Sequence, residues 1–273
     1  MVTTLIKHEA LRTSSWLAVV FGAATILLLV GVLMELTPWR VVQGLGFALT
    51  LVPVFALLLV VQVALAFDYW RSSYSKTGYF TQSLPVKGST IYGAKFLWGS
   101  LITIVAVLVN IVMAAVALVG ASRVFDMGIT LREIVDLLAT TLSATPVWAS
   151  VLVIVLAVVA ILSSLAQYFF AASIGSEGKI NRLGIGGPIL IYFLLYMVMQ
   201  VLLFVAIIAV PLGLSSSRLD GNLEVVPMDV LGSMVSNQDP DALPLGFIPM
   251  LFIVSAALVW RTVVSWNKKV SLV

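Results

Sequence analysis

The sequence contains no cysteine and a single histidine in 273 residues. The lack of cysteine excludes disulfides, thiolate metal sites and lipidated cysteines. The one histidine, His8, excludes a site with two histidine ligands, and its place near the N-terminus excludes a serine-histidine-aspartate triad deep in the chain. An enzyme that works inside a membrane needs such groups, so an enzymatic role is not expected.

Charge is also scarce, whereas apolar residues are abundant. Charged residues make up 10% of the chain and hydrophobic residues 61%, with a mean hydropathy of +1.14, which excludes a soluble globular domain. Crossing a hydrocarbon core takes about 20 apolar helical residues. We predict an all-α integral membrane protein, one transmembrane domain over residues 1–273, with six transmembrane helices at residues 16–34, 44–67, 94–119, 147–174, 187–210 and 246–264.

The distribution of charge predicts the orientation of these spans. Lysine and arginine are retained on the cytoplasmic side of a membrane. With the N and C termini cytoplasmic, eleven of the fifteen basic residues lie inside and nine of the twelve acidic residues lie outside. The net charge of +3 is therefore explained by the orientation of the chain in the membrane, and it gives no support for nucleic-acid binding. Together with the lack of cysteine, this favours a multi-pass protein of a bacterial inner (plasma) membrane.

Two cytoplasmic segments have a composition unlike that of the spans. Residues 3–15 predict a short interface helix that lies along the lipid surface. Residues 68–95 form an aromatic and basic segment between spans 2 and 3. Pro85 disfavours a helical Leu84, so we predict a helical piece near residues 72–83, a break, and a new helix capped by Ser89 or Thr90.

The two long outer segments, residues 120–146 and 212–245, each contain a predicted helix. Thr130 and Glu133 have capping-box spacing ahead of apolar residues that share one helical face, which predicts an amphipathic helix lying on a surface. The second segment is acidic and rich in proline, with a predicted short helix at residues 228–235. These pieces form either an outer vestibule or solvated connectors.

The predicted spans contain amides and hydroxyls but no carboxylate. Ion-coupled transporters usually place a carboxylate within a span. The amides Gln62, Asn110, Gln167 and Gln200 either line a substrate pathway or, more commonly for such groups, form hydrogen bonds between helices.

The chain lacks a nucleotide-hydrolysing motif. The segment from Gly88 to Lys95 has the wrong spacing for a phosphate-binding loop, because Ala94 separates Gly93 from Lys95 and Phe96 follows. We therefore expect no cofactor in this chain. Any energy for transport must come from a partner.

Two short runs resemble one known family. Residues 78–86, Gly-Tyr-Phe-Thr-Gln-Ser-Leu-Pro-Val, followed by residues 87–95, Lys-Gly-Ser-Thr-Ile-Tyr-Gly-Ala-Lys, are similar to the region of ABC-2 type ABC transporter permeases where a coupling helix meets the third span. Residues 7–12, Lys-His-Glu-Ala-Leu-Arg, resemble the basic N-terminal interface helix of that family. The sequence departs from the family where Lys87 and Gly88 replace a common Ser-Arg pair.

The resemblance implies the permease subunit of an ATP-driven exporter, which forms half of a translocation pathway. Its partners would be an ABC ATPase subunit dimer that binds ATP and magnesium, the lipid bilayer, and a second copy of itself or a homologous permease. Close approach to that second permease would be permitted by Gly22, Gly31, Gly44 and Gly46. The residues implied in contact with the ATPase are Glu9, Arg12, Arg71, Lys76, Tyr79, Phe80, Leu84, Pro85 and Lys87. The alternatives are an ion-coupled secondary transporter and a non-transporting membrane scaffold or immunity protein.

Overall fold

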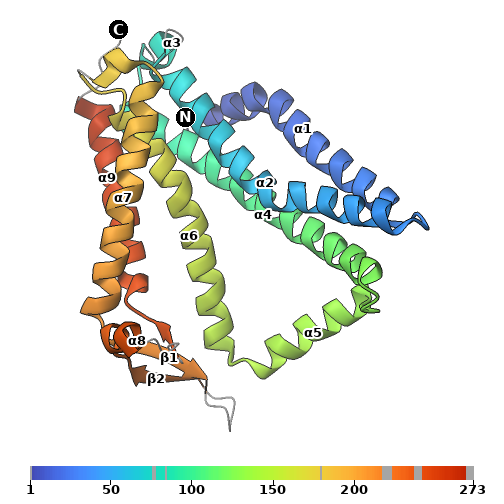
Figure 1. The fold of residues 1–273 in the computed structure, drawn as a ribbon. Helices are drawn as coiled ribbons and strands as arrows, with labels where there is room; N and C mark the ends of the chain where they lie inside the picture. The colour runs from blue at the N-terminus through green and yellow to red at the C-terminus, as the bar shows by residue number, and fades with distance from the viewer. Residues whose placement is uncertain are drawn as a thin grey trace. The chain divides into compact units, whose positions relative to one another are not determined.

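The computed structural model is built mainly from long helices (Figure 1). It describes residues 2–75, 78–83, 85–178, 180–216, 223–236 and 242–268. Within these residues, six helices are long and apolar enough to cross a membrane. They are α1 (Val2–Glu35), α2 (Arg40–Ser73), α4 (Gly88–Val124), α6 (Val147–Ile174), α7 (Gly186–Ala209) and α9 (Phe247–Lys268).

These six helices confirm the prediction of a multi-pass helical membrane protein. Most of their apolar side chains are exposed in the isolated chain, as expected for helices that lie in lipid. The bounds of α6 coincide with residues 147–174, because Pro146 ends the preceding segment and fits the start of a helix.

The interface helix and the first span are one continuous helix, α1. Its ribbon bends after the first few turns (Figure 1). In this region Thr13 Oγ1 donates a hydrogen bond to the Glu9 carbonyl at 2.9 Å, and Ser14 Oγ donates to the Leu11 carbonyl at 3.1 Å. Such bonds from side chain to backbone bend helices.

Shorter elements connect the spans. They are α3 (Gly78–Gln82), α5 (Leu131–Ala144), the 3-10 helix η1 (Ile180–Leu183) and α8 (Val230–Ser236). The helix predicted at residues 228–235 is therefore confirmed as α8. The predicted caps Ser89 and Thr90 are wrong, because α4 already begins at Gly88 and Lys87 holds the cap position without a side-chain bond.

The all-α prediction missed a small sheet between α7 and α9. Strands β1 (Leu212–Ser216), β2 (Leu223–Pro227) and β3 (Leu243–Pro244) pair in the order β2-β1-β3, and both pairings are antiparallel. Leu214 of β1 lies between Val225 and Leu243. The described residues of this segment, 212–216, 223–236 and 242–245, therefore include a paired sheet and a short helix.

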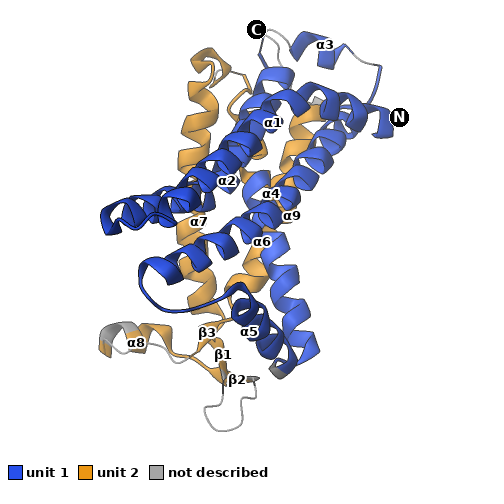
Figure 2. Cartoon of the chain, turned by 90° about the vertical axis from the view of Figure 1, so that its right-hand side faces the viewer, with its two compact units in different colours: residues 1–165 blue, residues 166–273 orange. Residues whose placement is uncertain are grey.

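The chain divides into two compact units (Figure 2), residues 1–165 and residues 166–273. In the first unit α1, α2 and α4 pack together, with Leu57, Val61 and Ala106 almost fully buried. In the second unit α7 packs with α9 and η1. The glycine at position 246 allows the start of α9 to approach the backbone of Ala206, since a Cβ there would lie 2.1 Å from the Ala206 carbonyl oxygen.

Close packing of α1 against α2 depends on Gly31 and Gly46. A Cβ on Gly31 would lie 2.5 Å from Thr50 Cγ2 and 2.8 Å from the Gly46 carbonyl oxygen. These two glycines are therefore used within the chain, which corrects the expectation that they serve contact with a second permease. Gly22 and Gly44 have no atom within 4 Å of such a Cβ.

Candidate functional site

Helix α3 is fixed to the end of α2 by hydrogen bonds. Thr81 Oγ1 donates to the Ser72 carbonyl at 2.8 Å, and Gln82 Nε2 donates to the Ser73 carbonyl at 3.2 Å. Gly78 allows the contact, because a Cβ at this position would lie 2.5 Å from the Ser73 carbonyl oxygen. The short helix therefore has a defined attachment to α2.

Two aromatic side chains of α3 are largely exposed. Tyr79 is 64% exposed and Phe80 76% exposed, and their rings meet edge to face with centroids 6.2 Å apart. Large exposed aromatic residues outside the spans are typical of contacts with another protein.

A charged cluster lies beside α3, between α1, α2 and α4. Its centre is Lys95, which is only 4% exposed. Lys95 Nζ donates to Glu9 Oε1 at 2.8 Å and to Ser72 Oγ at 2.8 Å. Arg12 forms ion pairs with both Glu9 and Asp68, with 2.7 Å between Arg12 Nη2 and Asp68 Oδ2. Two cations and two carboxylates therefore compensate one another, as buried charges require.

Ser72 connects this cluster to α3. Its carbonyl accepts the bond from Thr81, and its hydroxyl accepts the bond from Lys95. A continuous path of polar contacts therefore runs from α3 through α2 to α4 and on to α1. A further bond, from Trp98 Nε1 to Thr13 Oγ1 at 2.9 Å, ties α4 to α1 one turn along.

The cluster borders a cavity of about 830 Å³. Apolar, hydroxyl and charged groups from all four helices line it, including Trp16 of α1, Arg71 of α2, Phe80 of α3 and Ile91 of α4. Phe80, one residue of the exposed aromatic pair, therefore lies at the edge of this cavity.

The residues predicted to contact an ATPase fall into three groups. Glu9 and Arg12 belong to the charged cluster, and Tyr79 and Phe80 form the exposed pair. The remaining described residues are exposed around α3: Arg71, Pro85 and Lys87. Two predicted positions, Lys76 and Leu84, lie outside the described residues.

Sequence reasoning missed three members of the cluster, Asp68, Ser72 and Lys95. Asp68 directly follows the second charge-free run, and Lys95 directly precedes the third. Opposite charges at the adjoining ends of two spans are the signal that could have identified them. Lys95 was expected in a cytoplasmic connector, whereas the structure buries it in the second turn of α4.

The four amides proposed for a substrate pathway have different surroundings. Gln62 is buried and joins α2 to α6, since its Nε2 donates to the Ile161 carbonyl at 3.2 Å and its Oε1 accepts from Ser164 at 2.9 Å. This geometry is that of a structural hydrogen bond. Asn110 is half-buried in α4, Gln167 is half-buried in α6, and Gln200 is exposed on α7.

A buried carboxylate lies at the opposite end of α1. Glu35 is the last residue of α1 and is 3% exposed. Its Oε1 accepts a bond from Thr50 at 3.0 Å, and a Cβ on Gly120 would lie 1.9 Å from Oε2. Glu35 therefore lies one residue beyond the predicted first span, residues 16–34, but is buried within the first unit.

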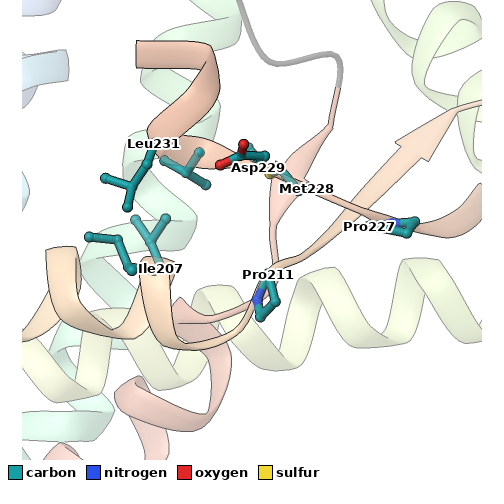
Figure 3. Close-up of a pocket in the computed structure, with 8 residues that line it drawn as sticks. Ile207, Pro211, Pro227, Met228, Asp229 and Leu231 are labelled. Carbon is teal, nitrogen blue, oxygen red and sulfur yellow. The ribbon is translucent and has the colours of Figure 1, made fainter. Parts of the chain in front are cut away.

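A second cavity, of about 410 Å³, lies in the second unit between the end of α7, the sheet and α8. Ile207 and Leu231 point into it (Figure 3). Asp229 also lines it, but its carboxylate accepts the Gly232 amide at 2.9 Å and so caps α8. The lining is mainly apolar and Asp229 caps a helix, so we attribute this cavity to the packing of α8 against the end of α7 and not to a binding site.

Comparisons of the chain with protein-family models, curated proteins and solved structures found no match.

Proposed function

We propose that this chain is the membrane subunit of an ATP-driven exporter of the ABC-2 type. It forms half of a translocation pathway, and a second copy or a homologous permease forms the other half. A separate ABC ATPase dimer binds ATP and magnesium and docks on α3 from the cytoplasm of a bacterial cell. The chain itself is a transport subunit and not an enzyme.

One observation carries the proposal: an exposed aromatic pair lies on a short helix that is bonded into a polar path through three long helices. A surface used only for docking needs the exposed pair. A surface that transmits movement also needs a rigid connection behind it. The bonds from Thr81 to Ser72 and from Lys95 to both Ser72 and Glu9 supply that connection.

The aromatic pair supplies the anchors of the docking surface. Buried aromatic residues contribute most of the binding energy in many interfaces, while surrounding polar residues exclude water. Tyr79 and Phe80 have the exposure needed for this role, and Arg71, Pro85 and Lys87 form the rim.

The charged cluster makes the ends of α1, α2 and α4 move together. When the ATPase dimer closes, it displaces α3. Ser72 passes this displacement to α2 and, through Lys95, to α4. Since Glu9 bonds Lys95 and Arg12 bonds Asp68, α1 follows. A single movement of α3 therefore reaches three helices.

Ion-coupled secondary transport is the second candidate function, and Glu35 favours it. A buried carboxylate at the end of an apolar helix is a residue type that coupled transporters use. Loss of gradient-driven flux in Glu35→Gln, in membranes without an ATPase partner, would support this candidate over the exporter.

The proposal is tested by purifying the tagged chain from its native membrane in mild detergent and measuring ATPase activity in the eluate. The parent chain is expected to retain a partner with ATPase activity. Phe80→Glu places a charge at the centre of the docking surface, so it is expected to lose that activity while inserting normally.

Val225→Glu is the matched control. Val225 is an apolar side chain of β2, 59% exposed, on the segment predicted to lie outside the cell. It is expected to retain the ATPase. A parent chain that purifies folded and abundant without ATPase activity would contradict the proposal.

A further inference from the structure

Helix α5 has a clear apolar face that the rest of the described chain leaves uncovered. At about 100° per residue, Leu131, Val135, Leu138 and Leu142 share one arc of the helix, and most of its polar side chains lie on the opposite arc. These four apolar side chains are exposed between 55% and 59%, and Leu137, which lies outside the arc beyond Thr141, is 67% exposed. The polar arc contains Arg132, Glu133, Asp136, Thr140 and Ser143.

The helix is well formed despite this lack of cover. Thr130 and Glu133 make a complete capping box: Thr130 N donates to Glu133 Oε2 at 2.7 Å, and Glu133 N donates to Thr130 Oγ1 at 3.3 Å. A helix of 14 residues is marginal in water by itself. Its apolar arc therefore needs an environment that the chain does not provide.

The connections of α5 identify that environment. The helix follows α4 after residues 125–130 and precedes α6 after residues 145–146, and both neighbours are spans. Both ends of α5 are thus held near the membrane surface. Trp148, at the start of α6, is 55% exposed, and exposed tryptophan beside a span marks the boundary between lipid and water.

We propose that α5 lies in the outer leaflet of the bilayer, with its apolar arc buried among the acyl chains and its polar arc in water. The polar arc carries one arginine against two carboxylates, so apolar burial and not attraction to anionic lipid drives the binding. The segment between spans 3 and 4 is then an amphipathic helix bound to the membrane and not a solvated connector.

Nitroxide labels test this placement directly, because the cysteine-free chain gives no background labelling. Leu138→Cys carries the label on the apolar arc, and Thr140→Cys is the matched control on the polar arc. The full chain is placed in lipid nanodiscs, and each label is probed with oxygen, which concentrates in lipid, and with a water-soluble nickel chelate.

The label at position 138 is expected to show an oxygen-to-nickel accessibility ratio several times that of the label at position 140. Equal, high nickel accessibility at both positions would overturn the proposal and leave a solvated connector. Shielding of position 138 from both reagents would overturn it in favour of a protein contact. Val135→Cys, on the same arc as Leu138, repeats the measurement if the first variant fails to fold, and none of these outcomes depends on the ATPase.

Discussion

The ammonium of Lys95 donates a hydrogen bond to Glu9 Oε1 at 2.8 Å, although the two residues are 86 positions apart in the sequence. This bond joins the start of α4 to the start of α1. Lys95 is also bonded to Ser72, which holds α3. The relationship places an almost fully buried cation directly behind the surface that we assign to an ATPase partner.

Glu9→Gln should destabilise the chain strongly, because it leaves Lys95 buried without its carboxylate. Breaking one side of a buried pair removes about 3 kcal/mol or more of stability. The midpoint of thermal unfolding in detergent measures the effect.

The double variant Glu9→Gln with Lys95→Met should recover most of that loss, since it removes both charges. Lys87→Met, a lysine that is exposed near the same helix start, is the control and should change stability by less than about 0.5 kcal/mol. Equal destabilisation by the single and double variants would show that the ion pair is not the stabilising feature.

Thr81→Val should separate docking from coupling. It removes the bond from α3 to Ser72, worth about 1 kcal/mol, while Phe80 stays on the surface. The ATPase should still bind, but hydrogen exchange in the first turns of α4 should no longer respond to ATP.

Ser83→Ala is the control for this experiment, because the Ser83 hydroxyl bonds only to the Phe80 carbonyl among the contacts described for it. Its response to ATP should match that of the parent chain. An unchanged response in Thr81→Val would place the route of coupling elsewhere.

Gly31→Ala should lower stability by about 1 to 3 kcal/mol, because its methyl group meets the backbone and side chain of α2. Gly22→Ala, in the same helix with open space around it, should be neutral or stabilise the chain by up to about 1 kcal/mol. Chemical unfolding of both variants in the same detergent makes the comparison. Similar losses in both would mean that helix α1 is sensitive to alanine for another reason.

Thr130→Ala should weaken the start of α5 by about 1 kcal/mol, since it removes one half of the capping box. Amide exchange at Ile134, whose amide donates to the Thr130 carbonyl at 3.1 Å, should then rise roughly fivefold. Thr140→Ala, an exposed threonine in the same helix, should leave that exchange unchanged.

The sequence was most informative where the signal is local. Apolar runs located six long helices, Pro146 located the start of α6, and the spacing of Thr130 and Glu133 identified a capping box that the structure contains. Each of these signals depends on residues within a few turns of one another, so the sequence contains all the information needed.

Long-range relationships were not predictable in the same way. The sequence shows Glu9 and Lys95 as polar residues at two separate span ends, and only the packing of α1 against α4 brings them together. Glu35 directly follows the first charge-free run, and only the packing of α1 against α4, where Gly120 leaves the space, buries it. The sheet at residues 212–244 was missed because its strands are short and contain glycine, serine and proline.

The central claim is that α3 touches an ATPase, and a crosslink from Phe80→Cys tests it most directly. The single-cysteine chain is crosslinked in its native membrane, and any attached soluble protein is identified and assayed. Val225→Cys on β2 is the control, and in intact cells it should react with a membrane-impermeant maleimide that does not reach position 80. The account predicts an adduct with an ATPase from position 80 and none from position 225. The absence of an ATPase adduct from position 80, in a chain that is folded and abundant, would contradict the account. Labelling of position 80 by the maleimide from outside the cell would also contradict it.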